Sequence, residues 1–141
     1  MAHEAATTFL ESFMVRIYQP PLVALRNELH DLPVVLRTVV LVIDFSTEIA
    51  QEGIAGFLEN STGQFLPETV TALQTIGALE TAEALAVVRD LLAHSPAAAQ
   101  ETARHSALSN GEADELLMPY VTDHLEELQD SVSHYQTKYG S

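Results

Sequence analysis

The 141-residue chain carries 20 Asp and Glu residues against six Lys and Arg residues, a net charge of −14 with histidine neutral. Its composition is 47% hydrophobic, which is enough apolar side chain to fill a core without disulfides. It includes no cysteine, which excludes disulfides, cysteine-based zinc sites and cysteine nucleophiles. The charge disfavours direct binding of nucleic acid or an anionic membrane and favours basic proteins, polyamines or divalent cations as partners. The length fits one domain, predicted to span residues 1–141.

The acidic residues occur along the whole chain. Residues 1–89 carry 11 acids and four bases, and residues 90–141 carry nine acids and two bases, so each part has a net charge of −7. The second part is shorter, which predicts a higher charge density toward the C-terminus. A solvated surface that only keeps the protein soluble is the plain alternative. The missing cysteines and the lack of a basic, signal-like start lead us to expect a cytoplasmic protein.

The first 19 residues have the periodicity of a helix. Phe9, Phe13 and Ile17 recur at i, i+4 and i+8 within residues 4–19, as expected for one apolar face. The Pro20–Pro21 pair ends this helix, and a short helix is predicted to follow over residues 22–29.

Residues 34–43 support two interpretations. They are dense in β-branched side chains, which favours a buried strand. The polar residues favour a helix, because Arg37 and Asp44 are seven positions apart and would point to opposite faces of a strand. Glu48 and Gln51 continue the same helical stripe at spacings of four and three. We therefore predict a helix over about residues 32–51.

Glycine, proline and asparagine mark the boundaries of the middle helices. A bend or short helix is predicted between Gly53 and Asn60, followed by a turn over residues 60–63. The next helix is predicted to begin at Pro67 and to end at Gly77.

Two further boundaries follow along the chain. A helix is predicted over residues 81–94, after which Ser95 is the expected N-cap of another helix with Pro96 at its first position. Asn110 and Gly111 are predicted to form a C-terminal stop.

The last helix, over about residues 120–139, has the clearest pattern. Its apolar side chains recur at spacings of 4, 3, 4, 3 and 4 and form one seam: Val121, Leu125, Leu128, Val132, Tyr135 and Tyr139. The opposite face carries Asp123, Glu126, Glu127 and Asp130. Along one helix these four charges would span about 10.5 Å, comparable with one phosphate per about 3.4 Å of a DNA strand. Glu112, Asp114 and Glu115 extend this candidate partner-binding surface.

Two segments carry a family resemblance. Residues 48–60, EIAQEGIAGFLEN, resemble the pattern Glu-hydrophobic-x-Asn-Gly-Gly-Phe-x-Gln-Phe-Phe-x-Asn, and residues 68–78, ETVTALQTIGA, resemble Glu-x-hydrophobic-x-Ala-Leu-x-x-Ile-Gly-Ala. Both patterns are similar to those of a bacterial domain family, otherwise of unknown function, that includes a DNA-mimic protein. The chain has Glu52, Ile54 and Gly56 where that pattern has Gly, Phe and Gln.

The resemblance implies an all-α fold, a single-domain bundle of about six to eight helices with a family-like core over about residues 32–94. It also implies a non-enzymatic, acidic protein that occupies the DNA-binding surface of a basic protein such as a transcription factor. The residues that it marks as structural are Glu48, Gly53, Phe57, Asn60, Gly63, Leu73, Ile76 and Gly77.

Two alternatives remain open. One is a general interaction or self-association module, including a homodimer, that uses the apolar seam of the last helix. The other is a metal-dependent hydrolase, for which the i, i+4 pairs Asp44/Glu48 and Asp130/His134 are the candidates. No catalytic residue, cofactor or metal ligand is predicted for the favoured function.

Overall fold

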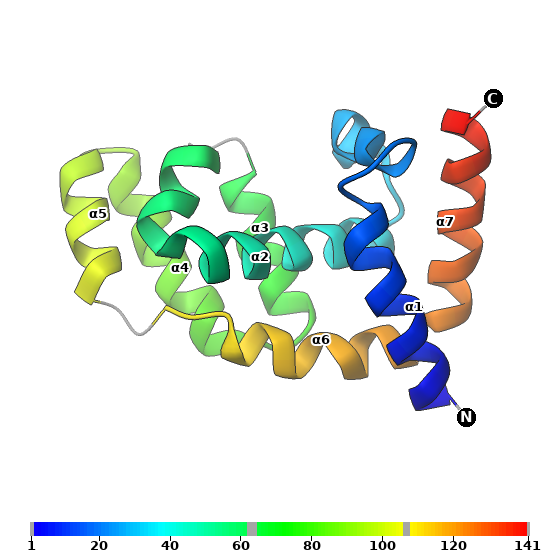
Figure 1. Cartoon of the computed structure of the whole chain (residues 1–141). Helices are drawn as coiled ribbons and strands as arrows, with labels where there is room; N and C mark the ends of the chain where they lie inside the picture. The colour runs from blue at the N-terminus through cyan, green and yellow to red at the C-terminus, as the bar shows by residue number, and fades with distance from the viewer. Residues whose placement is uncertain (1, 62–64, 106–107, 141) are drawn as a thin grey trace. The chain divides into compact units, whose positions relative to one another are not determined.

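A computed structural model of the chain describes residues 2–61, 65–105 and 108–140, with the side chains of all of these except residues 2, 3, 55 and 59–61. Across these ranges every regular element is a helix, which confirms the all-α prediction (Figure 1). The elements are α1 (Ala2–Arg16), the 3₁₀ helix η1 (Leu22–Asp31), α2 (Val34–Ser61), α3 (Leu66–Thr75), α4 (Leu79–Leu92), α5 (Pro96–His105), α6 (Gly111–Asp123) and α7 (Leu125–Gly140). With α2 divided at Gly53, the described residues hold nine helical segments, one above the predicted range.

The chain packs as two compact units. Unit 1 comprises Met1–Val40 and Leu117–Ser141, and unit 2 comprises Leu41–Leu116. Unit 1 is therefore built from the two ends of the chain, and unit 2 from its middle.

Unit 1 is closed around side chains from α1, η1, α2, α6 and α7. Fully buried side chains include Phe13 of α1, Ile17 of the turn after it, Leu25 of η1 and Leu128 of α7. The end of α1 and the turn after it are held by Arg26, whose Nη1 donates a hydrogen bond to the Ile17 carbonyl at 2.6 Å. The apolar face predicted for residues 4–19 is thus a core face, as the helical spacing indicates.

Unit 2 contains the rest of α2, then α3, α4, α5 and the start of α6, with α4 packed against both α3 and α5. Its core includes Phe45 and Phe57, whose rings meet edge to face at 5.3 Å. The Phe57 side chain is brought back toward the core because α2 breaks at Gly53, whose φ of 72° and ψ of 179° are accessible only to glycine.

The end of α3 shows why Gly77 is needed. Gly77 has a φ of 90°, and the Ala78 amide donates to the Leu73 carbonyl at 2.9 Å while the Gly77 amide donates to the Gln74 carbonyl at 3.0 Å. These two bonds are those of a Schellman C-cap, which requires a left-handed residue at this position. The predicted helix end at Gly77 is confirmed.

Several other predictions about the helices are confirmed. Residues 34–43 form a helix and not a strand, because they belong to α2. Ser95 caps α5, since its Oγ accepts a hydrogen bond from the Ala98 amide at 3.3 Å, the third residue of that helix. Part of the predicted turn over residues 60–63, including Gly63, lies outside the described residues, and Asn60 belongs to the end of α2.

Two predicted boundaries are wrong. Asn110 and Gly111 do not stop a helix but start α6, where the Asn110 carbonyl accepts from the Asp114 amide at 2.9 Å. The predicted single helix over 120–139 is interrupted at His124, so that α6 ends at Asp123 and α7 begins at Leu125. The chain changes direction at this residue (Figure 1), and the apolar seam belongs to two helices.

Candidate functional site

The seven predicted partner-binding residues form two groups. Glu112, Asp114 and Glu115 belong to unit 2, at the start of α6. The other four belong to unit 1, at the junction of α6 and α7: Asp123, Glu126, Glu127 and Asp130.

The group in unit 1 lines one shallow depression together with His124 and Ser131. All four acidic residues are exposed, and their carboxylates make no hydrogen bond or ion pair with other residues of the described ranges. Asp123 precedes the junction and the other three follow it, so the charge spacing expected along one straight helix does not apply. The junction nevertheless keeps all four carboxylates around the same depression.

His124 holds this junction. Its amide donates to the carbonyls of Tyr120 and Val121, both at 3.2 Å, and its Nδ1 lies 2.8 Å from the Tyr120 carbonyl oxygen. Because a carbonyl only accepts, Nδ1 carries the proton in this contact. The ring centroids of Tyr120 and His124 are 4.3 Å apart. Burial raises the pKa of the Tyr120 hydroxyl.

Glu112 has a structural role that the sequence does not indicate. Ala78, the N-cap of α4, provides no side-chain cap, and the Glu112 Oε1 accepts the Thr81 amide at 2.9 Å instead. This amide is the third of α4, one of the donors that a helix leaves without an internal partner. The hydrogen bond from the Thr81 amide lowers the pKa of Glu112. Glu112 therefore caps a helix to which it does not belong.

Asp114 is also engaged within unit 2. Its Oδ1 accepts a short hydrogen bond from the Ser46 hydroxyl of α2, and its Oδ2 accepts the Asn110 side-chain amide at 3.0 Å. Glu115, by contrast, is exposed and has no such contact with the described part of the chain. Of the three predicted residues on α6, Glu115 is the one whose carboxylate is not used by the fold.

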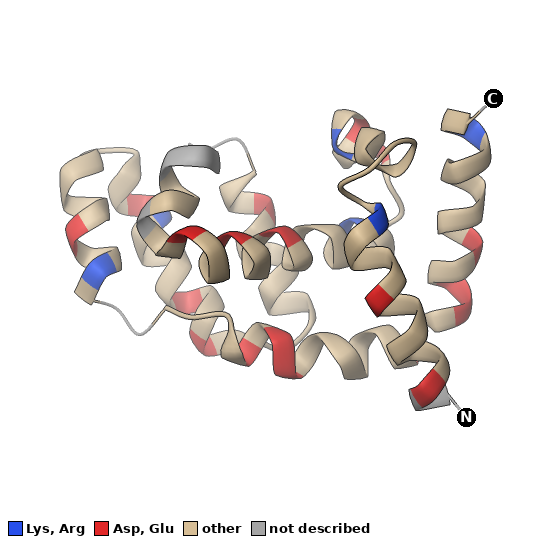
Figure 2. Cartoon of the chain, viewed as in Figure 1, with Lys and Arg blue, Asp and Glu red and all other residues tan. Residues whose placement is uncertain are grey.

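Unit 2 carries most of the acidic residues, a distribution that was not predicted, and its exposed acidic residues form what we call its acidic surface. This unit holds 12 of the 20 acidic residues and two of the six basic residues, a net charge of −10, while unit 1 holds eight acids and four bases, a net charge of −4. Figure 2 shows acidic positions along α2 and on the neighbouring helices of unit 2. Because unit 1 is assembled from both ends of the chain, dividing the sequence at any single residue hides this asymmetry.

A row on α2 is the most regular part of this acidic surface. Asp44, Glu48 and Glu52 follow each other at i, i+4 and i+8 and therefore lie along one side of the helix. The two carboxylates that were candidates for acid–base chemistry, Asp44 and Glu48, belong to this row. Their spacing was the signal in the sequence that could have identified the row.

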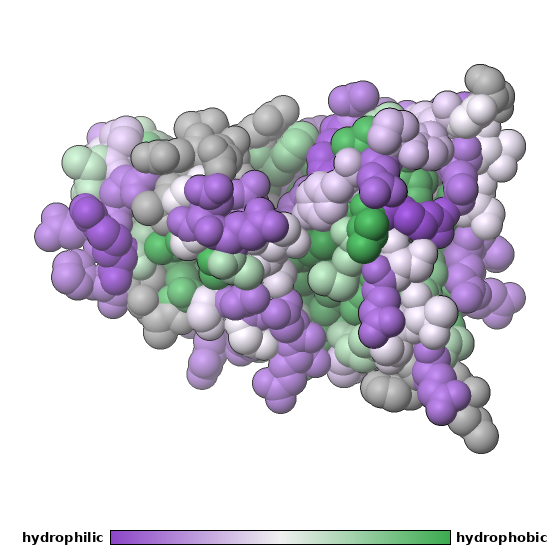
Figure 3. Space-filling model, in the orientation of Figure 1, coloured by the Kyte–Doolittle hydropathy of each residue, from purple (hydrophilic) through white to green (hydrophobic). Residues whose placement is uncertain are grey.

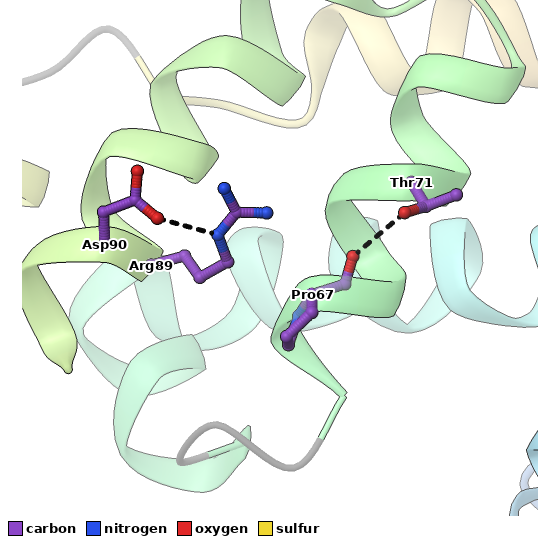
Figure 4. Close-up of polar contacts among 4 residues, drawn as sticks. All are labelled: Pro67, Thr71, Arg89 and Asp90. Carbon is purple, nitrogen blue, oxygen red and sulfur yellow. Dashed lines mark hydrogen bonds and ion pairs between the residues drawn. The ribbon is translucent and has the colours of Figure 1, made fainter.

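One of the two basic residues of unit 2 is neutralised locally. Arg89 Nε lies 3.1 Å from the Oδ1 of its neighbour Asp90 on α4 (Figure 4). The same view shows Thr71 donating back to the Pro67 carbonyl at 3.3 Å in the first turns of α3. Arg89 thus offsets the charge of the carboxylate next to it in the sequence.

The residues that the motif marks as structural are mostly buried. Phe57, Leu73 and Ile76 belong to the core of unit 2, Gly53 and Gly77 have positive φ, and Glu48 is half-buried. The Asn60 side chain and Gly63 lie outside the described residues.

The described residues contain no group of three or more His, Asp or Glu side chains arranged to hold a metal ion, so neither Asp44/Glu48 nor Asp130/His134 is part of such a group there. No helix in this described part of the chain is both long enough and apolar enough to cross a membrane.

The fold and the charge together define an acidic protein whose described elements are all helices. In its unit 2, Gly53 and Gly77 interrupt or end helices, and Glu112 caps α4. A family comparison places it further: the chain belongs to the DMP19-like protein family, whose model matches residues 30–139. The match confirms the resemblance to the DNA-mimic-like domain family and covers all of unit 2. No curated protein and no solved structure matches the chain.

Proposed function

We propose that this chain is a non-enzymatic protein of the DNA-mimic type, which binds the basic, DNA-binding surface of a partner such as a transcription factor. The observation that carries the proposal is the net charge of −10 on unit 2, within the part of the chain that matches the family.

The amount of charge supports this function. A net charge of magnitude about 2–8 is enough to keep a small domain soluble, and unit 2 alone exceeds this with 76 residues. Like charges at this density repel each other and oppose folding. The positive charges of a basic partner would offset the repulsion between these carboxylates, as they offset the repulsion between phosphates when the partner binds DNA.

The availability of the carboxylates supports it as well. Within the described ranges of unit 2, five acidic residues are exposed and free of hydrogen bonds and ion pairs: Glu52, Glu80, Glu83, Glu101 and Glu115. They come from α2, α4, α5 and α6. An anionic surface shared by several helices suits a partner that recognises charge over an extended area rather than a single pocket.

The row on α2 has a spacing suited to basic side chains. Four residues correspond to about 6 Å along a helix axis, so Asp44, Glu48 and Glu52 present a carboxylate about every 6 Å. A DNA strand presents a charge about every 3.4 Å along its axis, so the row alone is less dense than DNA. The neighbouring helices of unit 2 must supply the remaining charge.

The test is capture of partners from a cell lysate with three proteins: the native chain and two variants that each lose four charges. The unit 2 variant replaces Glu80, Glu83, Glu101 and Glu115 by Gln. The matched unit 1 variant replaces the carboxylates of the junction by their amides: Asp123→Asn, Glu126→Gln, Glu127→Gln and Asp130→Asn.

We expect the native chain to capture basic DNA-binding proteins at about 50 mM salt and to release them at about 500 mM, because screening weakens contacts between charges. The captured protein should lose its DNA in a competition assay with the native chain. The unit 2 variant should bind at least tenfold more weakly, and the unit 1 variant should bind nearly as well as the native chain. Failure to capture any basic DNA-binding protein at low salt, or equal binding by all three proteins, would contradict the proposal.

A further inference from the structure

Helix α1 has a second face that the core does not use. Its residues Ala6, Leu10 and Phe13, and Ile17 of the turn after it, are buried in unit 1. At about 100° per residue, a different side of the helix and of the turn after it carries Glu4, Glu11, Met14, Val15 and Tyr18. All five are exposed.

The apolar end of this face is unusually open. Met14, Val15 and Tyr18 are 39%, 57% and 44% exposed, and Val23 at the start of η1 is 42% exposed. Figure 3 shows apolar atoms at the surface over this part of α1 among polar neighbours. Of the seven large hydrophobic side chains most exposed in the described chain, these four fall within ten residues. Grouped exposure of this kind marks interaction surfaces, whereas single exposed apolar residues do not.

The charges on the face run from acidic to basic. Glu4 and Glu11 stand toward its N-terminal end, and the Arg26 guanidinium lies over the Tyr18 ring, 4.9 Å from its centroid, at the other end. If two copies of α1 pair antiparallel about a two-fold axis between residues 14 and 15, residue i of one copy faces residue 29 − i of the other. Glu11 of each copy then faces Tyr18 and Arg26 of the other copy, so the two-fold axis produces this contact twice.

We propose that this face, formed by Glu11, Met14, Val15, Tyr18 and Val23, is a self-association surface whose occupant is the same face of a second copy of this chain. An isologous pair of this kind requires a self-complementary patch, and the antiparallel arrangement provides apolar contact at its centre and opposite charges at its two ends. Residues 1–40 carry four acids and three bases, the part of the chain with the least net charge, so two copies approach here with the least repulsion.

The seam of the last helix does not offer this surface. Val121, Leu128, Val132 and Tyr135 are 0–7% exposed and belong to the core of unit 1. The self-association considered from the sequence therefore cannot use that seam, and α1 supplies a different one. The surface is independent of the acidic surface of unit 2, and either assignment can fail without the other.

The experiment is sedimentation equilibrium of the native chain from about 5 to about 500 µM, the range in which small interfaces dissociate. A dimer that forms with rising concentration is expected. Val15→Glu places a carboxylate at the two-fold axis and should weaken dimerisation at least tenfold. The matched control is Val87→Glu, since Val87 is 48% exposed on α4 of unit 2; it should leave the dimer unchanged.

Crosslinking gives a second measurement that uses the absence of cysteine from the chain. Under mild oxidation Met14→Cys should form a disulfide-linked dimer much faster than Val87→Cys. The native dimer should persist at about 500 mM salt, because its centre is apolar and screening acts on charges. A chain that is monomeric at every concentration overturns the proposal, and so does a dimer that survives Val15→Glu in a folded variant.

Discussion

Replacing Glu112 by Ala should destabilise the protein even though the residue lies on a surface helix. The substitution removes the acceptor that binds the third amide of α4 at 2.9 Å and leaves that helix with no side-chain cap. Loss of such a cap costs about 0.5–2 kcal/mol, and loss of a negative charge at a helix N-terminus costs a further 0.3–1 kcal/mol or so. We expect about 1–2 kcal/mol in total, or a melting temperature about 3–8 °C lower for a chain of this size.

Urea unfolding followed by circular dichroism measures this effect, with Glu115→Ala as the control on the same helix. Glu115→Ala should change the free energy of unfolding by less than about 0.5 kcal/mol, since its carboxylate is exposed. Equal stability of the two variants would refute the capping role of Glu112.

The pH dependence of unfolding provides an independent check on Glu112. Its pKa is lowered in the folded protein, so its contribution is complete above the unfolded value of about 4.3 and is lost as the pH falls through the lower folded value. The difference in stability between the native chain and Glu112→Ala should therefore be constant from neutral pH to about pH 5 and shrink below about pH 4. A difference that stays constant down to acid pH would show that the carboxylate charge takes no part in the cap.

Three further predictions concern stability. Gly77→Ala should cost about 1–2 kcal/mol because φ is 90° there, whereas Gly140→Ala at the end of α7 should be nearly neutral; thermal unfolding distinguishes them. Leu128→Ala removes a fully buried side chain of unit 1 and should cost about 2–5 kcal/mol by urea unfolding. In the native chain the 2.9 Å ion pair with Lys138 lowers the pKa of Glu28. Lys138→Met removes this pair, so the variant should be slightly less stable than the native chain near neutral pH. The difference should vanish as Glu28 is protonated in acid or as the salt concentration is raised.

The helices were predictable where a local signal determines them. The polar stripe from Arg37 to Glu48 outweighed the β-branched composition of residues 34–43, because its spacing is compatible with a helix face and not with a strand face. Ser95 and Gly77 were equally readable, since a cap depends on the residue at one position and its nearest neighbours.

The errors arose at two positions where the sequence pattern does not distinguish the observed structure from the predicted one. Asn110 and Gly111 look like a helix stop, but the Asn110 side chain bonds Asp114 one turn later and so helps to begin α6. The break at His124 is marked by neither glycine nor proline, and the apolar spacing passes through it unchanged. Val121 and Leu128, on either side of the break, are both buried in unit 1, as they would be on one continuous helix, so the apolar pattern does not reveal the break.

The candidate site was predictable in composition and not in arrangement. A row of acids on a helix can be recognised from its spacing, but whether a carboxylate is available to a partner depends on what lies opposite to it in the fold. Thr81 is 31 positions from Glu112 and Ser46 is 68 positions from Asp114. No sequence pattern relates residues so far apart, so these two structural carboxylates were indistinguishable from the exposed Glu115.

The separation of structural from exposed carboxylates bears on why the chain is so acidic. Glu112 and Asp114 stabilise unit 2 through hydrogen bonds to its own amides and hydroxyls, and this needs only a few acids. The exposed Glu83 and Glu101 make no contact of this kind in the described residues, and they repel the other acids around them. Neither stability nor solubility calls for a charge of −10 on this unit. The basic partner that we propose would account for that excess, because its positive charges would offset the repulsion between these carboxylates.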